Sequence, residues 1–149
     1  MTARRIKRVI IHCTYTPQGR DYGVKDIDKW HKKRGWSGCG YHRVIRRTGV
    51  VEQGRPLDED GILEPNEVGA HAKGHNLDSI AVALVGGMKK IDSFEHIPDC
   101  NFTQAQWRAL AVEVAWLEAL YGPLKIVGHR DLNPLKACPC FDVKEWRYG

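Results

Sequence analysis

Short apolar runs recur along the chain, with polar or amphipathic segments between them. Val9 to Ile11 and Ile80 to Val85 are apolar without alternation, which is typical of strands covered on both faces. Tyr41 to Arg46 and Val50 to Gln53 flank a Thr-Gly pair, a pattern that predicts a hairpin whose glycine supplies positive φ. Leu124 to Val127 is a further predicted strand.

Two longer segments have the spacing of helices. In the first, Val24, Ile27 and His31 lie on one face, and three basic residues follow in the last turn. The second runs from Thr103 to Tyr121, opens with a Thr-x-x-Gln capping box and is followed by Gly-Pro. Phe141 to Trp146 predicts a short closing helix. Because strands alternate with helices, we expect an α/β fold with a central mixed sheet of about five strands flanked by helices.

The segment from Gly54 to Asn76 is more than twenty residues long and lacks clear periodicity. Loops of this length without regular structure are uncommon in compact domains and are usually functional. We therefore expect this segment to wall a site. Strand order is left open by the pattern.

Length and composition narrow the class of protein. The 149 residues fit one domain, predicted over 1–149, and 42% hydrophobic with 28% charged residues is ordinary for a soluble globular protein. No window approaches the roughly 18 to 20 apolar residues of a membrane span. The basic start, Met1 to Arg8, lacks the apolar core of a signal peptide, so we expect cytoplasmic synthesis.

The formal net charge of +5 favours a polyanionic partner without identifying it. Nucleic acid, an anionic membrane and the bacterial cell wall all qualify. The basic residues are scattered and have no interleaved aromatic residues that would make a stacking platform. We therefore do not expect direct binding to nucleic acid.

Two histidines, His12 and His129, stand at the ends of apolar strands, where open α/β sheets bind ligands. Cys138 follows His129 closely enough for a loop to return to the same edge. A His-His-Cys set fits tetrahedral Zn²⁺ with a fourth position open to water, as in hydrolytic zinc sites. On spacing alone, histidines that are simply hydrogen-bonded at strand ends remain the alternative.

An ordered series of motifs covers nearly the whole chain. In this series the chain resembles the zinc-dependent N-acetylmuramoyl-L-alanine amidases, particularly the small phage lysozymes related to peptidoglycan recognition proteins. The motifs are Ile11-His12-Cys13, Trp30-His31 with Gly35-Trp36, Gly40-Tyr41-His42, Gly69 to Gly74, Asn76 with Ser79-Ile80, Leu84 to Gly87, and Gly128-His129 with Lys136 to Pro139.

The resemblance implies that His12, His129 and Cys138 are zinc ligands and that Tyr41 and Lys136 are the catalytic pair. The implied reaction hydrolyses the amide between N-acetylmuramic acid and L-alanine in peptidoglycan. The Lys136 ammonium would stabilise charge on the carbonyl oxygen, and the Tyr41 hydroxyl would position water or relay a proton. Taken alone, Tyr41 would more often be an interior aromatic residue and Lys136 a solvated loop charge, but their placement beside the ligand motifs favours the catalytic assignment.

Other residues receive weaker predictions. The resemblance makes His71, Lys73 and Asn76 substrate contacts, with an ordinary surface loop as the alternative. His42 is expected to be packed in the interior, since it alternates with Tyr41 along a predicted strand. No role is assigned to three histidines: His31, His75 and His96.

The five cysteines are an odd number, so a complete disulfide framework is not expected. Cys13 should point away from His12, because side chains alternate along a strand, and should be a small core residue. Cys140 stands where the resembled family more usually has Ser or Gly. It therefore predicts either an alternative metal ligand or a Cys138–Cys140 oxidation product.

Together these features predict a monomeric phage or prophage endolysin with one Zn²⁺, which acts on the cell wall after release by an unknown route. A host recycling or interbacterial role is left open. A non-catalytic peptidoglycan-recognition module is the main alternative. Cys138 argues against it, since loss of the thiolate is the usual mark of such relatives. A nucleic-acid or polymerase-binding protein is suggested only by the charge, and polymerase binding is left open.

Overall fold

The computed structural model describes residues 4–89 and 97–148. Within these ranges the chain forms a five-stranded sheet in the order β5-β4-β7-β2-β9, together with two smaller two-stranded sheets and four α-helices. The strands are β1 (Arg4–Arg5), β2 (Arg8–Cys13), β3 (Thr16–Pro17), β4 (Arg43–Ile45), β5 (Val51–Gln53), β6 (Ile62–Leu63), β7 (Ser79–Leu84), β8 (Gly87–Met88) and β9 (Lys125–Gly128). The helices are α1 (Val24–Lys33), α2 (Gln104–Tyr121), α3 (His129–Leu132) and α4 (Val143–Tyr148), with a 3₁₀ turn, η1, over Asn76–Asp78.

The central sheet is mixed, as predicted. β4, β7, β2 and β9 run parallel, and β5 is antiparallel to β4 through the predicted hairpin. β2 and β7 are buried along almost their whole length, which explains their unbroken apolar sequences. Their register pairs His12 with Ala83, and Ile11 pairs with Gly128 of β9. The residue after Gly128 is therefore brought beside His12.

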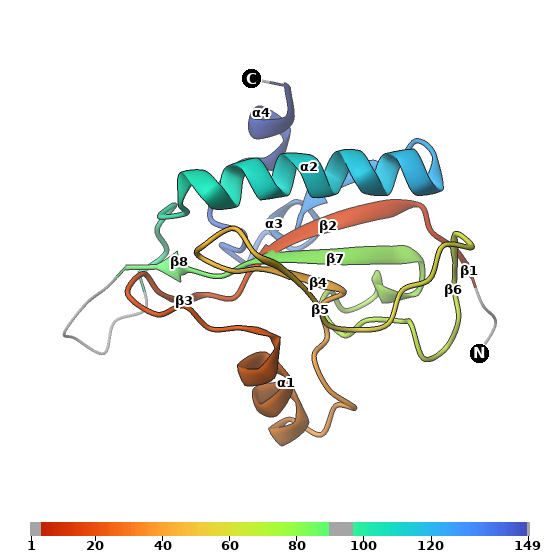
Figure 1. Ribbon diagram of the computed structural model, residues 1–149, viewed down its shortest axis with the longest axis horizontal. Coiled ribbons are helices and arrows are strands. Elements are labelled where there is room, and N and C mark those ends of the chain that lie inside the picture. Colours follow the sequence, from red (N-terminus) through yellow and green to blue (C-terminus); the bar gives the residue numbers. More distant parts are fainter. Residues whose placement is uncertain (1–3, 90–96, 149) are drawn as a thin grey trace.

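Helix α2 covers one face of the sheet (Figure 1). It begins where the sequence predicts, because Thr103 Oγ1 accepts from the Gln106 amide and Gln106 Oε1 accepts from the Thr103 amide. Its buried side chains pack with the odd-numbered positions of β2 into the main core. This core includes, among others, Val9, Ile11, Cys13, Leu110, Val114 and Leu117.

Helix α1 lies on the opposite side of the sheet (Figure 1). Ile27 packs there with Val44 and Val85 in a smaller apolar cluster. The even-numbered positions of β2 face this side, since side chains alternate along a strand. His12 therefore faces away from α2, whereas Cys13 faces the main core.

Two small pairings, β1 with β6 and β3 with β8, were not predicted from the sequence. Each strand has two residues, too few for a periodic pattern. The predicted loop 54–76 has little regular structure, and β6 lies within it. None of the helices in the described part of the chain is long and apolar enough to cross a membrane.

Candidate metal centre

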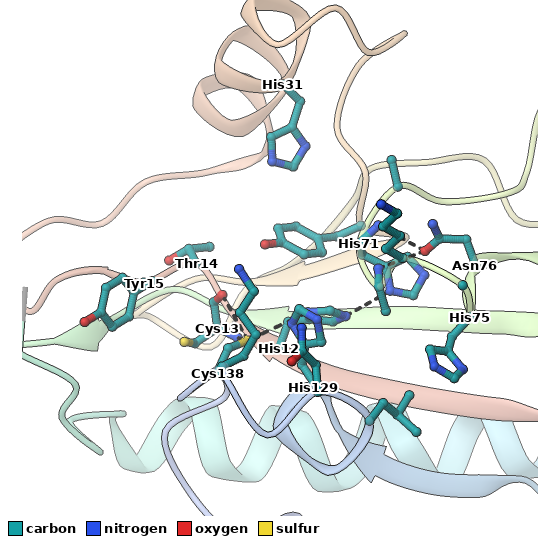
Figure 2. Close-up of a pocket in the computed structure, with 18 of the residues that line it drawn as sticks. His12, Cys13, Thr14, Tyr15, His31, His71, His75, Asn76, His129 and Cys138 are labelled. Atoms are coloured by element: carbon teal, nitrogen blue, oxygen red, sulfur yellow. Dashed lines mark hydrogen bonds between the residues drawn. The ribbon is translucent and has the colours of Figure 1, made fainter.

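Three predicted ligands converge at the carboxyl edge of the central sheet. His12 is near the end of β2, His129 starts α3 directly after β9, and Cys138 lies in the following loop. Figure 2 shows the side chains of His12, His129 and Cys138 next to one another at this edge of the sheet. One donor atom from each residue lies within 4.8 Å of the other two.

This donor set fits zinc. His12 Nδ1 is 3.7 Å from Cys138 Sγ, and the His12 and His129 ring centroids are 4.6 Å apart. Zinc–sulfur and zinc–nitrogen bonds at a tetrahedral angle separate the two ligand atoms by about 3.6 Å. Two imidazoles and a thiolate also match the preference of Zn²⁺ for nitrogen and sulfur donors.

The surroundings favour the thiolate form of Cys138. The pKa of Cys138 lies well below its ordinary value because the Cys13 thiol hydrogen-bonds to its sulfur and because His12 and His129 lie beside it. The Cys13 backbone amide also donates to Cys138 Sγ, at 3.2 Å. Metal binding requires a deprotonated sulfur, so these contacts make Cys138 chemically suited to bind a metal ion.

His71 fixes the orientation of the His12 ring. His12 Nε2 is 2.9 Å from His71 Nδ1, while His12 Nδ1 faces Cys138. Burial lowers the pKa of both histidines, so both are neutral near pH 7. For Nδ1 of His12 to bind a metal, its Nε2 must carry the proton and donate a hydrogen bond to His71 Nδ1.

The hydrogen bond to His12 leaves the second ring nitrogen of His71, Nε2, without a partner among the described residues. Once its Nδ1 accepts from His12, His71 carries its own proton on this buried Nε2. A buried unpaired N–H is destabilising, so this arrangement is held by its surroundings.

Two local features hold His71 in place. Asn76 Oδ1 accepts hydrogen bonds from the His71 and Ala72 backbone amides. The preceding residue, Ala70, passes so close to Gly40 that a Cβ on Gly40 would lie 2.0 Å from the Ala70 oxygen. Asn76 therefore acts here on the loop backbone, and only glycine fits at position 40.

Tyr41 lies beside the predicted ligands, just before β4. Its ring centroid is 5.2 Å from that of His12 and 5.5 Å from that of His31. Burial raises the pKa of Tyr41 above its ordinary value. The hydroxyl is therefore protonated near neutral pH and can donate a hydrogen bond to a group beside the ligands.

The centre lies in a groove of about 950 Å³. Arg34, Lys73 and Lys136 line this groove, and none of its described lining residues is acidic. The long loop predicted to wall a site contributes Ala70 to Asn76. The local charge therefore favours anionic ligands.

Two histidines that received no role, His31 and His75, also line the groove. His31 Nδ1 accepts from the Gly40 amide at 2.8 Å, and burial lowers the His31 pKa to about 4. A signal for His31 is present in the sequence, because the apolar face of α1 continues from Ile27 to an imidazole. His96 lies outside the described residues.

His42 is packed, as predicted. Its Nδ1 accepts from the Ala81 amide and its Nε2 donates to the Glu67 carbonyl oxygen, so both ring nitrogens are used. Burial lowers the His42 pKa to about 4. His42 therefore holds the groove wall to β7 and has no free nitrogen for a ligand.

A second group of potential metal donors lies elsewhere. Asp58, Asp60 and Glu67 bring carboxylate oxygens within 4.8 Å of one another. Asp58 and Asp60 are exposed, while Glu67 is buried. Proximity alone therefore does not single out the histidine–cysteine group.

The fold agrees with what comparison with known proteins shows. Residues 2–141 match the model of the family described as N-acetylmuramoyl-L-alanine amidase. The chain belongs to this amidase family. The resemblance seen in the motifs is thereby confirmed.

Individual proteins that are similar to this chain are phage endolysins and a bacterial amidase. An endolysin of Klebsiella phage KP32 is 43% identical over 139 residues, which is 93% of this chain and 83% of the endolysin. An endolysin of Escherichia phage T7 is 41% identical over 138 residues, with the same two coverages of 93% and 83%. Among solved structures, N-acetylmuramoyl-L-alanine amidase LysC from Clostridium intestinale URNW superposes with a TM-score of 0.75 at 26% identity, over 97% of this chain and 85% of LysC.

Proposed function

We propose that the protein is a zinc-dependent endolysin that hydrolyses the amide between N-acetylmuramic acid and L-alanine in peptidoglycan. The observation that carries this proposal is the convergence of His12, His129 and Cys138 in a groove of an amidase-family chain. Three protein ligands leave one position of a tetrahedral ion for the reaction. We assign these three residues as the zinc ligands.

His12, His129 and Cys138 would hold the zinc ion, which would supply Lewis acidity toward a carbonyl oxygen and toward water near neutral pH. The protein prepares the ligands for it. The contacts to Cys138 favour its thiolate, and His71 Nδ1 accepts a hydrogen bond from the protonated Nε2 of His12. His12 then presents its unprotonated Nδ1 toward Cys138 and His129.

We assign Lys136 and Tyr41 as the catalytic pair. Lys136 is an exposed residue on the rim of the groove, where its ammonium can approach a substrate carbonyl oxygen that becomes negative. Tyr41 keeps its proton, so it acts as a hydrogen-bond donor that positions water or the scissile amide. Both residues act on the reacting atoms from beside the ligands.

Substrate binding in the groove follows from its charge. Lys73 is exposed on the groove wall and, with Arg34, can contact carboxylates of a peptide stem. We also assign His71 and Asn76 to the substrate-binding wall. Their bonds to His12 and to the loop backbone support this role by shaping the wall that the substrate meets.

The cellular role proposed is lysis of the host wall by a phage or prophage. The phage endolysins of similar sequence support it, as does a net charge of +5, which attracts an anionic wall. We propose that residues 1–149 act as one amidase domain, consistent with the family match over 2–141.

Mass analysis of digested cell walls tests the bond. Purified peptidoglycan is treated with the zinc-loaded protein, and the products are compared with those from chelator-treated protein. We expect stem peptides with a new free L-alanine amino terminus, released only in the presence of zinc. A protein that binds the wall with stoichiometric zinc but releases no peptide would instead be a non-catalytic recognition module, and the proposal would be wrong.

A further inference from the structure

Two thiols lie in contact behind the metal centre, on the core side of β2. Cys13 is the last residue of β2 and is 3% exposed, whereas Cys140 is half-buried in the loop that follows Cys138. Their sulfurs are 3.7 Å apart. Both cysteines are free thiols in this structure.

The two sulfurs share a recess beside Gly87. Cys140 Sγ donates to the Gly87 carbonyl oxygen at 3.2 Å. A Cβ at Gly87 would lie 2.6 Å from Cys13 Sγ and 3.5 Å from Cys140 Sγ. The absence of a side chain at Gly87 therefore makes room for the thiol pair.

The backbone holds Cys140 in a tight turn. Its φ is +72°, a left-handed conformation that favours glycine, and its amide donates to the Ala137 carbonyl oxygen at 2.7 Å. A cysteine occupies this unfavourable backbone position, and its sulfur reaches Cys13 and Gly87. The third thiol of the region, Cys138, lies 3.7 Å from His12 Nδ1 and also accepts a hydrogen bond from the Cys13 thiol.

We propose that Cys13 and Cys140 are an oxidation site that forms a disulfide when the protein meets a small-molecule disulfide oxidant. One protein thiol attacks the oxidant and releases one thiol; the second protein thiol then attacks the mixed disulfide and releases another. The protein loses two hydrogens and gains one S–S bond, while the oxidant is reduced to two thiols. The sulfurs, now 3.7 Å apart, must approach by about 1.6 Å to reach bonding distance.

The cross-link would tie the loop that carries Lys136 and Cys138 to the end of β2. It joins residues 127 positions apart, so it removes much of the conformational freedom of the unfolded chain. Cys138 stays outside the bond, but it would lose the hydrogen bond from the Cys13 thiol. This inference rests on the sulfur geometry alone and does not require the proposed function.

The test uses the full-length chain incubated with zinc and oxidised glutathione, then alkylated, digested and analysed by mass spectrometry. We expect a linked peptide pair that contains Cys13 and Cys140 and is two hydrogens lighter than the reduced peptides. We also expect the unfolding midpoint to rise by about 10 °C and to return after reduction with dithiothreitol. Glutathione retained on Cys140 with a free Cys13, or a Cys138–Cys140 link, would overturn the proposal.

Two variants make the assignment specific. Cys140→Ser should abolish both the linked peptide and the rise in midpoint. Cys100→Ser removes an exposed thiol outside the pair and should keep both effects. An equal rise in midpoint for oxidised Cys140→Ser would show that another bond is responsible and would refute the site.

Discussion

Among the described residues, two groups of side chains have donor atoms close enough to surround a metal ion, yet they are built in opposite ways. His12, His129 and Cys138 come from a strand, a helix start and a loop that meet at one edge of the sheet. The acidic group of Asp58, Asp60 and Glu67 comes from the two sides of β6, within the segment 54–76. The histidine–cysteine group lines a groove, whereas the acidic group accepts hydrogen bonds from nearby backbone amides.

The acidic oxygens already have hydrogen-bond donors. Glu67 accepts from the Asp58 and Glu64 amides, each at 2.9 Å, through different oxygens. Asp58 and Asp60 likewise accept from backbone amides two residues further along the chain. These carboxylates therefore replace a regular hydrogen-bonding pattern for the loop backbone.

The histidine–cysteine group uses hydrogen bonds differently. His12 has a partner on Nε2, on the side away from Cys138, and Cys138 accepts donors that favour its thiolate. A candidate metal centre therefore differs from a structural cluster in having unprotonated donor atoms with an available lone pair. Proximity of the donor atoms matters less.

The largest effect is expected for Cys138→Ser, which removes the only sulfur of the candidate centre. The hydroxyl is a poorer zinc ligand than a thiolate, so we expect loss of bound zinc and a fall in wall-lysis activity of at least about a thousandfold. The fold should persist, because Cys138 is not among the fully buried core residues. Zinc content, circular dichroism and lysis rates measure the three expectations.

The exposed acidic residue Asp60 provides the matched control. Asp60→Asn also changes a donor atom of a possible metal group, and it should leave zinc content and lysis unchanged. If Asp60→Asn released the zinc while Cys138→Ser retained it, the two groups would have been assigned in the wrong order.

Lys136→Ala should have the next largest effect. Removing a donor to the developing negative charge should lower turnover by about a hundredfold. Zinc content should stay the same, because Lys136 is not one of the predicted ligands. Steady-state lysis rates of the zinc-loaded variant measure this, and loss of zinc equal to that of Cys138→Ser would contradict the division between ligand and catalytic residues.

His71 offers a smaller, graded test of how the His12 ring is held. His71→Leu removes the acceptor for His12 Nε2 and should weaken zinc binding by about tenfold or more. His71→Asn retains an acceptor close to the position of Nδ1 and should bind zinc more tightly than the leucine variant. Competition with a chelating dye measures both affinities, and equal weakening would show that the hydrogen bond is unimportant.

Glu67→Gln should have the smallest effect on function and a measurable effect on stability. The amide can accept at one oxygen only, so either the Asp58 or the Glu64 amide would lose its partner. We expect the free energy of unfolding to fall by about 2 kcal/mol, with zinc affinity unchanged. Urea denaturation and dye competition test the two parts, and a change in zinc affinity would show that the acidic loop is coupled to the centre.

The sequence predicted those parts of the fold whose pattern is local. β2 and β7 are covered on both sides and so are continuously apolar, and α2 carries its own capping box. The pairs β1–β6 and β3–β8 depend on contacts between distant, very short segments, which leave no periodic pattern. Strand order was likewise left open, because it depends on packing between elements.

The candidate site was predicted in the same uneven way. His12 and His129 follow recognisable strands, so their common edge could be expected from the sequence. The bond between His12 and His71 could not, since it joins residues 59 positions apart and depends on the close approach of Ala70 to Gly40. The contact of Cys140 with Cys13 was also missed, because a turn with positive φ directs the Cys140 sulfur to β2.

The register of β2 decides both whether the core packs correctly and whether His12 faces the groove. His12 and Cys13 are neighbours, but one faces the groove and the other the main core. Sliding β2 by one residue along β7 would exchange these two directions, leaving an imidazole among aliphatic side chains and a thiol where nitrogen is needed. A chain trapped in that alternative pairing would be both less stable and inactive, so recovery of lysis after refolding reports on strand alignment.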